Sequence, residues 1–372
     1  MKIRSLPRRH PWIIALLTLC LITGCITMFV TTPPRELDRL KASPRFINGK
    51  FRNDAPPRVR SFKQNMEILW KFATLKNQQV PSHPLPTRPV DLSHFNTPAP
   101  KGLNTTWLGH STLLIQVDGH RIITDPVLEK RVSLLGPSRF TPLPEMDLSH
   151  IRHVDLVLIS HNHYDHLNRF SIQTLAPVTQ RFLVPLGVGP TLEKWGVPRE
   201  KIQELDWWDN VTLGDLTLTA TPAQHFSGRT PLDANKTLWA SWVIQGPAHQ
   251  LFFSGDSAYF KGFKTIGEQF GPFDMTFLEC GSYDALWADV HMVPEETVRA
   301  HLDLKGKILH PMHWGTFNLA NHPWYDPMVR LDKAARKAGV PLATPVAGQT
   351  LFPQQNRLGA PWWTAHADTP AP

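Results

Sequence analysis

The residues best suited to chemistry stand together in one short stretch of the chain. It reads Ser160-His161-Asn162-His163-Tyr164-Asp165-His166 and follows directly on an apolar run over residues 154–159. Neutral imidazole and carboxylate are side chains that zinc prefers in proteins. Four of them within six residues, at the end of a buried strand, are typical of a metal site rather than of a solvated polar loop. The stretch therefore predicts that His161, His163, Asp165 and His166 bind metal.

Three further side chains of the same kinds follow or adjoin apolar runs later in the chain. They are His225 after residues 216–220, Asp256 after residues 250–254, and His313 in His310-Pro311-Met312-His313. Taken singly, such a residue is more often structural. Together with the first four they make seven ligands, which divide into two sites: His161, His163 and His225 in one, and Asp165, His166 and His313 in the other. Asp256 would bridge them.

The elements that must position these ligands are short. Apolar, β-branched runs bounded by turn residues predict strands at residues 112–117, 121–124, 154–160, 216–221, 238–244, 250–254 and 275–279. Helical patterns fall at residues 61–76, 168–175, 191–195, 294–302 and 327–338. Strands and helices in this mixed order predict an α/β fold in which helices cover two sheets.

The composition limits the class of protein. Of 372 residues, 41% are hydrophobic and 19% charged, which excludes a disordered or highly charged tail protein. The formal net charge is +8, and Lys2, Arg4, Arg8 and Arg9 supply part of it at the N-terminus. A basic surface can attract phosphate or anionic lipid. Because no Lys/Arg-rich block occurs elsewhere, we expect no nucleic-acid partner.

The N-terminus has the pattern of an export signal. A basic segment is followed by an apolar one, which contains Ile22-Thr23-Gly24-Cys25. That tetrad resembles a bacterial lipobox, so Cys25 is expected to be lipidated and to hold the protein in the bacterial cell envelope; an uncleaved signal anchor in the inner membrane is the alternative. Only Cys280 would then remain, and no intrachain disulfide could form. Beyond residues 1–25 we expect a Pro-rich linker and N-terminal wrap (26–100), a main domain (101–353) and a loosely ordered tail (354–372).

The ligand set resembles the signature of the metallo-β-lactamase superfamily, HxHxDH followed by His, Asp and His at strand ends. The resemblance implies an αββα sandwich with a di-zinc centre at one edge. All seven ligand positions of the signature are filled.

Longer stretches are similar to N-acylphosphatidylethanolamine-hydrolysing phospholipase D and its bacterial relatives. They lie between about residues 100 and 340, and include Thr106-Trp107-Leu108-Gly109-His110-Ser111, Leu205-Asp206-Trp207-Trp208-Asp209, Gly271-Pro272-Phe273-Asp274, Pro294-Glu295-Glu296 and His313-Trp314-Gly315-Thr316-Phe317. Residues 284–290, Asp-Ala-Leu-Trp-Ala-Asp-Val, depart from the phospholipase pattern, which is longer there and carries an Arg.

The same resemblance assigns roles to further residues. It places Tyr164 and His291 against the substrate, and it makes Asp165 and His291 catalytic. Asp125, before Pro126 at a strand end, would orient a ligating histidine; a plain turn-forming Asp-Pro is the alternative. Tyr164 and His291 could also be structural, and His110 could line the cleft or form an ordinary hairpin turn. Apolar residues that could form an acyl path are Trp207, Trp208, Leu286 and Trp287, although burial in the core is commoner for Trp.

The activity that the resemblance implies is cleavage of N-acylphosphatidylethanolamine to phosphatidic acid and an N-acylethanolamine. Two zinc ions would lower the pKa of a shared water and stabilise developing charge, and no Ser or Cys nucleophile is needed. The expected partners are a phospholipid or other small-molecule substrate and a membrane surface, with a homo-oligomer left open. The rivals are a lactonase or another phosphodiesterase on the same site, and a non-catalytic envelope lipoprotein.

Overall fold

The computed structural model describes residues 34–55, 61–74, 78–134 and 136–367. The export signal and Cys25 lie outside these residues. Among the described helices, none combines the length and apolar character needed to cross a bilayer.

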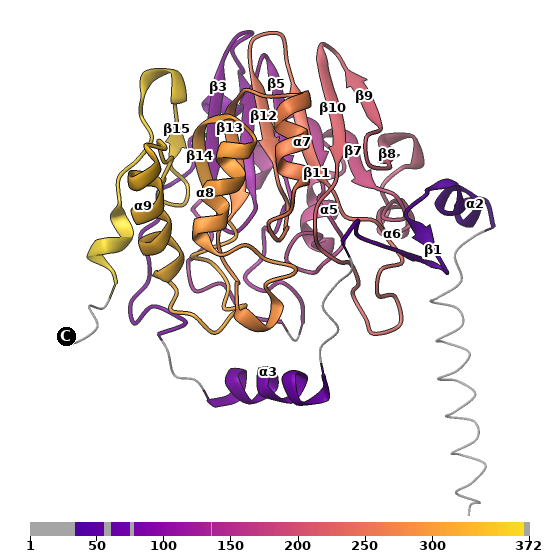
Figure 1. The fold of residues 1–372 in the computed structure, drawn as a ribbon. Helices are drawn as coiled ribbons and strands as arrows, with labels where there is room; N and C mark the ends of the chain where they lie inside the picture. The colour runs from indigo at the N-terminus through magenta and orange to yellow at the C-terminus, as the bar shows by residue number, and fades with distance from the viewer. Residues whose placement is uncertain (1–33, 56–60, 75–77, 135, 368–372) are drawn as a thin grey trace, which may run out of the picture.

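Two mixed β-sheets form the centre of the molecule (Figure 1). The first has seven strands in the order β15-β3-β4-β5-β6-β7-β8, antiparallel from β15 to β5 and parallel from β5 to β8. Its strands are β3 (Leu103–Trp107), β4 (Leu113–Val117), β5 (His120–Thr124), β6 (Val154–Leu158), β7 (Thr179–Pro185), β8 (Ile202–Leu205) and β15 (Thr350–Leu351).

The second sheet has six strands in the order β14-β13-β12-β11-β10-β9. It is antiparallel from β9 to β12 and parallel from β12 to β14. Its strands are β9 (Asn210–Leu213), β10 (Leu216–Thr221), β11 (Ser241–Gln245), β12 (Gln250–Phe253), β13 (Phe273–Glu279) and β14 (Gly306–Met312).

The main core lies between the sheets, and the alternation of side chains along each strand builds it. On β4, Ile115 joins the core that also holds Trp242 and Met275 of the second sheet. The preceding residue, Leu114, points to the other face of the sheet and packs with Phe182 in a second cluster. Each inner strand is therefore apolar on both faces, and each sheet needs a helical cover.

Helices supply that cover. The outer face of the first sheet packs against α5 (Arg169–Leu175) and α6 (Gly189–Lys194), and that of the second against α7 (Gly262–Gln269), α8 (Pro294–Asp303) and α9 (Asp326–Ala338) (Figure 1). Helix α5 begins where the side chain of Asn168 accepts from the backbone N–H of Ser171. Helix α9 ends at Ala338, and Gly339 after it has a φ of 69°, in the left-handed region that favours glycine. The result is an αββα sandwich, as predicted.

The N-terminal part wraps around this sandwich. It contains α2 (Pro34–Ala42), the hairpin β1 (Phe46–Ile47) and β2 (Lys50–Phe51), α3 (Phe62–Thr74) and α4 (Ser93–Asn96). Figure 1 shows α3 crossing below the edge where the loops after β13 and β14 lie. Gln78, which follows α3 in the sequence, forms two hydrogen bonds with the main domain. Its carbonyl accepts from the backbone N–H of Trp324 at 3.0 Å, and its side-chain oxygen accepts from the Tyr325 hydroxyl at 2.8 Å.

The sequence predicts a loosely ordered tail over residues 354–372, but its described part, residues 354–367, packs against the body. Trp363 is buried in the main core. The ring of Trp362 stacks on Trp314 at a centroid distance of 5.3 Å, and its Nε1 donates to the Pro345 carbonyl at 3.0 Å. Two large rings bury enough apolar surface to hold residues 354–367 on the body despite their Pro and Ala content.

Candidate metal centre

The loop that carries four of the predicted ligands leaves the carboxyl end of β6. Arg229 fixes its shape, because its guanidinium donates to the carbonyls of Asn162 at 2.9 Å and Leu167 at 2.7 Å. From the same sheet, the β3–β4 turn brings His110 to this loop. The second sheet contributes His225 after β10, Asp256 after β12 and His313 after β14. The site therefore lies where the strand ends of both sheets meet.

The structure brings all seven predicted ligands together. His161, His163 and His225 offer nitrogens within 4.8 Å of one another, and so do the ligand atoms of Asp165, His166 and His313, with His110 as a fourth member. Oδ2 of Asp256 lies between the groups: it is 3.1 Å from Nε2 of both His166 and His313, 3.7 Å from Nε2 of His225 and 3.9 Å from Nε2 of His161. This is the two-part arrangement that the sequence predicts, with Asp256 in the bridging place.

Buried polar atoms in the cluster show that it fits a metal. Oδ1 of Asp256 has no hydrogen-bond partner within the described part of the chain, and the 3.1 Å contacts of its Oδ2 with Nε2 of His166 and of His313 do not have hydrogen-bond geometry. A buried group left in this condition costs about 1–3 kcal/mol. Convergent imidazoles and carboxylates without partners are what a bound cation would satisfy.

The charges in the cluster lead to the same conclusion. Burial lowers the pKa of His161 well below its usual value, and those of His163 and His225 to about 3, so these imidazoles are neutral. Burial opposes ionisation of Asp165 and Asp256, but neighbouring imidazoles, His166 first, hold both pKa values well below their usual range. Although burial opposes it, Asp256 and Asp165 in turn raise the pKa of His166 well above its usual value and that of His313 to about 10, so without metal these two imidazoles carry the balancing positive charge, which a bound cation would replace.

Asp125 holds the ligand loop in place from behind. Its Oδ2 lies 2.7 Å from Nδ1 of His166 and accepts from the Ser160 hydroxyl at 2.6 Å, and its Oδ1 accepts from the Ser160 amide at 2.7 Å. The carboxylate turns the His166 ring so that Nε2 faces Asp256. This is the orienting contact expected of Asp125, rather than that of a plain turn residue.

His110 occupies the inner wall of the site, a place that the sequence left open. It is buried with φ of 54°, and its Nε2 lies 2.9 Å from Oδ2 of Asp165. Burial, aided by the neighbouring His313, lowers the pKa of His110 to about 3. A neutral His110 therefore donates to Asp165 and orients that carboxylate.

Glu279 is a site residue that the sequence analysis missed. It ends β13, is fully buried, and its Oε2 lies 2.9 Å from Nδ1 of His291. Burial, together with the charge of Asp256, raises the pKa of Glu279 well above its usual value. The signal was present, because Glu279 is a charged residue at the end of an apolar run, as Asp256 is.

A cavity of about 310 Å³ opens onto the cluster. Its polar wall includes His163, Asp165, Asp256 and His291, and its apolar wall consists of Phe226, Trp287, Val290 and Leu319. Trp287 and Val290 belong to residues 284–290, which depart from the phospholipase pattern. An apolar wall facing a polar, ligand-rich one suits a substrate with both characters.

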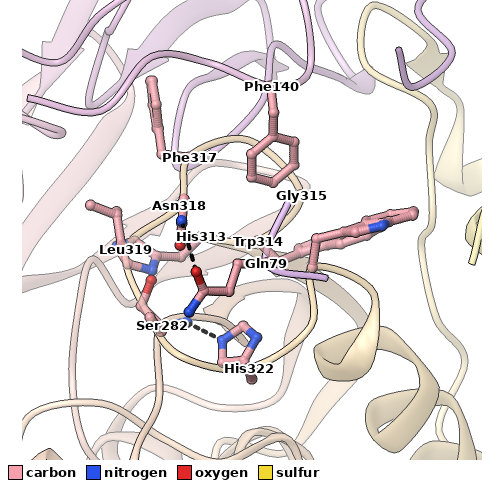
Figure 2. A pocket seen from close by; sticks show the side chains of 12 residues that line it. Gln79, Phe140, Ser282, His313, Trp314, Gly315, Phe317, Asn318, Leu319 and His322 are labelled. Atoms are coloured by element: carbon pink, nitrogen blue, oxygen red, sulfur yellow. Dashed lines mark hydrogen bonds between the residues drawn. The ribbon is translucent and has the colours of Figure 1, made fainter. Parts of the chain in front are cut away.

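The loop after β14 forms a wall of this cavity, and the N-terminal wrap supports it. Figure 2 shows Gln79 set against this loop, where the Asn318 amide donates to Oε1 of Gln79 at 3.3 Å and the Ser282 amide donates to Nε2 of His322 at 3.1 Å. Figure 2 draws a second, small cavity beside Gln79. Ser282, His313 and Leu319 line both this small cavity and the metal cavity. The wrap thus supports the loop that carries His313.

Three residues that the sequence predicts near the substrate, Tyr164, Trp207 and Trp208, are not among those that line the metal cavity. The ring of Tyr164 is 37% exposed and packs under the Arg229 guanidinium, 3.8 Å from it, instead of forming part of the cavity lining. Trp207 belongs to the main core, where its Nε1 donates to the Trp239 carbonyl at 2.6 Å, so it forms no acyl path. Trp208 borders a separate cavity of about 730 Å³, which Gln224 also lines.

Comparison with known proteins agrees with this fold and site. Residues 120–314 match the family model of the beta-lactamase superfamily domain. An uncharacterised protein of Mycobacterium tuberculosis (strain H37Rv) is 42% identical over 332 residues, which cover 86% of this chain and 87% of that protein. The N-acyl-phosphatidylethanolamine-hydrolyzing phospholipase D 1 of Caenorhabditis elegans is 32% identical over 256 residues, or 65% of this chain and 71% of that protein.

A solved structure gives the fold alone. Igni18, a metallo hydrolase from Ignicoccus hospitalis, superposes with a TM-score of 0.51 at 21% identity and covers 67% of this chain and 97% of its own. The chain belongs to the metallo-β-lactamase superfamily. It is a metal-dependent hydrolase of that fold, with homology to N-acylphosphatidylethanolamine-hydrolysing phospholipase D.

Proposed function

We propose that the protein hydrolyses N-acylphosphatidylethanolamine, or a phosphodiester lipid of the same kind, to phosphatidic acid and an N-acylethanolamine. The observation that carries this proposal is the homology to a phospholipase of that activity over 65% of the chain. The cavity supports it, because ligand-bearing residues face an apolar wall there. A phosphodiester fits the polar wall, and its fatty chains fit the apolar one.

We further propose that two Zn²⁺ ions are the cofactors. His161, His163 and His225 would hold one, Asp165, His166 and His313 the other, and Asp256 would contact both. Zinc in such a site lowers the pKa of water and neutralises charge on a phosphoryl oxygen. The chain itself contributes His291 in the cavity wall as a hydrogen-bonding group toward the substrate.

The proposed place of action is a membrane surface in the bacterial cell envelope, reached through lipidated Cys25. Helix α3 supports this, because Phe62, Met66 and Trp70 are 81%, 48% and 69% exposed and follow one another at the spacing of one helix face. The sequence from residue 56 to 76 carries five basic residues and one acidic residue. An exposed apolar and aromatic helix face within a basic stretch of sequence is typical of a segment that lies in a bilayer interface.

The activity is tested with the full chain, purified in detergent and loaded with zinc. It is incubated with N-acylphosphatidylethanolamine in mixed micelles in H₂¹⁸O, and the products are identified by mass spectrometry. We expect phosphatidic acid that carries ¹⁸O, unlabelled N-acylethanolamine, and no turnover by the His163→Ala variant. Protein that holds zinc but cleaves only lactones or small phosphodiesters would overturn the lipid substrate and favour those activities.

The membrane contact has its own test. Changing Phe62 and Trp70 to Ser should lower kcat/KM on substrate in anionic vesicles about tenfold or more, because each ring loses roughly 1.5–3 kcal/mol of burial. Activity on short-chain substrate dispersed below its micellar concentration should stay unchanged. Leu302→Ser, which removes an exposed apolar side chain on α8, is the matched control. Equal loss on both substrates would contradict an interfacial role for α3.

A further inference from the structure

The N-terminal wrap contacts the backbone of one predicted metal ligand. Nδ2 of Asn53, a half-buried residue after β2, donates to the carbonyl of His225 at 2.7 Å, and Oδ1 of Asn53 accepts from the backbone N–H of His225 at 3.3 Å. Oδ1 also accepts from Nε1 of Trp239 at 2.9 Å. Because an indole N–H can only donate, this third bond identifies the oxygen of the amide and leaves Nδ2 facing the His225 carbonyl.

The ladder of the second sheet does not reach His225. Strand β10 pairs with β11 as far as Thr221 and Ser241, and His225 lies beyond this last pair. His225 is also buried, and a buried backbone N–H or carbonyl without a partner is costly. Asn53 therefore takes the place that a neighbouring strand has within the ladder, and it does so with a side chain from outside both sheets.

The ring of His225 is fixed by a separate contact. Its Nδ1 donates to the carbonyl of Val290 at 2.9 Å, which leaves Nε2 for a metal. The ring reaches the site through only two side-chain torsions, so the place of Nε2 also depends on where the backbone of His225 lies. A shift of that backbone would move Nε2 relative to Nδ1 of His163, 3.3 Å away, and to Oδ2 of Asp256, 3.7 Å away.

Packing and charge hold the wrap in this place. Phe51, two residues before Asn53, is fully buried in the main core. On α2, Arg39 donates to the buried carboxylate of Glu204 at 2.6 Å. The family model matches residues 120–314, so the wrap lies outside the domain that defines the family. A segment from outside that domain thus takes part in building the metal centre.

We propose that Asn53 is a positioning residue of the metal centre and that the N-terminal wrap completes the site by setting the place of His225. This inference rests on the metal site of the proposed function and does not depend on the lipid substrate. Of the two ion sites, the one that contains His225 receives this support, whereas His166 of the other site is oriented by Asp125. Loss of Asn53 should therefore weaken one ion and spare the other.

The test is a competition titration of the full chain against a chelator, with Zn²⁺ as the probe. Asn53→Ala removes all three hydrogen bonds of the amide. We expect the affinity for one zinc ion to fall about 10–100-fold, the range for a residue that orients a metal ligand, and the affinity for the other to change less than about threefold. With Co²⁺ as the probe, the visible absorption of one ion should change, because these bands report ligand geometry.

The matched control is Asn96→Ala. Nδ2 of Asn96 donates to the carbonyl of His150 at 2.9 Å, and its Oδ1 accepts from the backbone N–H of Arg152 at 3.3 Å. This is the same kind of contact between a side-chain amide and a backbone, on a segment that carries none of the seven predicted ligands. Asn96→Ala should leave both zinc affinities and the Co²⁺ spectrum unchanged.

A second variant and a readout without metal complete the test. Asn53→Asp keeps the size of the side chain and can still accept from Trp239, but it cannot donate to the His225 carbonyl, so it should weaken the same ion. In the metal-free protein, hydrogen exchange of the His225 backbone N–H, followed by NMR, should be faster in Asn53→Ala than in the wild type.

The outcomes separate the role of Asn53 from the proposed activity. Unchanged zinc affinity in both Asn53 variants, or equal weakening of the two ions, would overturn the role of Asn53. So would a loss of the same size in Asn96→Ala, which would show that any weakened loop lowers the affinity. If the wild type binds two ions and Asn53→Ala selectively weakens one, but neither protein cleaves the lipid, the proposed substrate fails and the role of Asn53 stands.

Discussion

Oδ2 of Asp256 lies 3.1 Å from Nε2 of His166, and the two side chains come from different sheets. Asp256 follows β12 of the six-stranded sheet, whereas His166 lies in the loop after β6 of the seven-stranded one. The carboxylate also reaches toward His161, His225 and His313. Asp256 is therefore the charge shared by both ligand groups, and the packing of the two sheets is what creates the site.

Removing that charge should impair both halves of the site. We expect Asp256→Asn to keep the fold, since the side chain keeps its shape, but to hold less than half the zinc of the wild type and to lose turnover. Metal analysis after dialysis measures this. Asp332→Asn is the control, because it breaks an exposed pair with Arg336 on α9, worth about 0.2–0.5 kcal/mol. Full zinc content in Asp256→Asn would show that the carboxylate does not bridge the groups.

Asp125 should affect metal affinity without touching the metal. An Asn in its place cannot accept equally well from both the Ser160 hydroxyl and His166 Nδ1, so the His166 ring loses its fixed orientation. We expect zinc affinity to fall about 10–100-fold in a competition titration with a chelator. Asp155→Asn, a carboxylate on β6 that accepts from the Arg121 amide, should leave the affinity unchanged. A loss of the same size in both variants would mean general damage to the sheet.

The sequence was most informative where function and strand ends coincide. The seven ligands could be predicted because each follows or adjoins an apolar run, and because histidine and aspartate recur at the spacing typical of metal ligands. Glu279 was not found, and His110 stayed open between the cleft and a hairpin turn, because each stands alone and its role depends on which strand ends the fold brings together. Glu279 could have been found by the same reasoning that found Asp256.

Elements were missed where the pattern is short or interrupted. β8 and β9 have four residues each, β3 and β7 carry polar residues in Asn104-Thr105-Thr106 and Thr179-Gln180-Arg181, and β14 contains Pro311 and His310 within its apolar run. Their strand character comes from pairing with neighbours, which no local pattern encodes. The Pro content of residues 354–372 predicts a loose tail, but Trp362 and Trp363 pack against the body and hold the described part of it in place.

Chelation should lower thermal stability. Without metal, the cluster keeps buried nitrogens and a carboxylate oxygen without partners in the described part of the chain. A ligand at about a thousand times its Kd stabilises by roughly 4 kcal/mol, and 1 kcal/mol shifts Tm by about 2–4 °C in a domain of 150–250 residues. We therefore expect a chelator to lower Tm by at least several degrees in scanning calorimetry. The chelator should lower the Tm of the His163→Ala variant by less than that of the wild type. An equal decrease would show that the stabilising metal binds elsewhere.

His310 should make the stability of the protein depend on pH in a defined window. It is fully buried on β14, with its ring centroid 5.4 Å from that of Phe277 and 6.5 Å from that of Trp107, and burial lowers its pKa to about 4 from the ordinary 6.5. Between pH 6.5 and 4 the unfolded chain binds a proton at this position and the folded chain does not. The free energy of unfolding therefore falls as pH is lowered through this window, and the fall ends below about pH 4.

His310→Leu removes this proton-binding group and keeps the apolar contacts. Between pH 7 and pH 4, the free energy of unfolding should fall by up to about 3 kcal/mol less in the variant than in the wild type, given the size of the pKa shift of His310. Urea unfolding curves at several pH values, recorded with chelator so that metal release does not contribute, measure the difference. His150→Gln, at an exposed position, should follow the wild-type curve. If His310→Leu also follows it, the acid sensitivity comes from other buried histidines, such as His301, whose pKa burial also lowers to about 4.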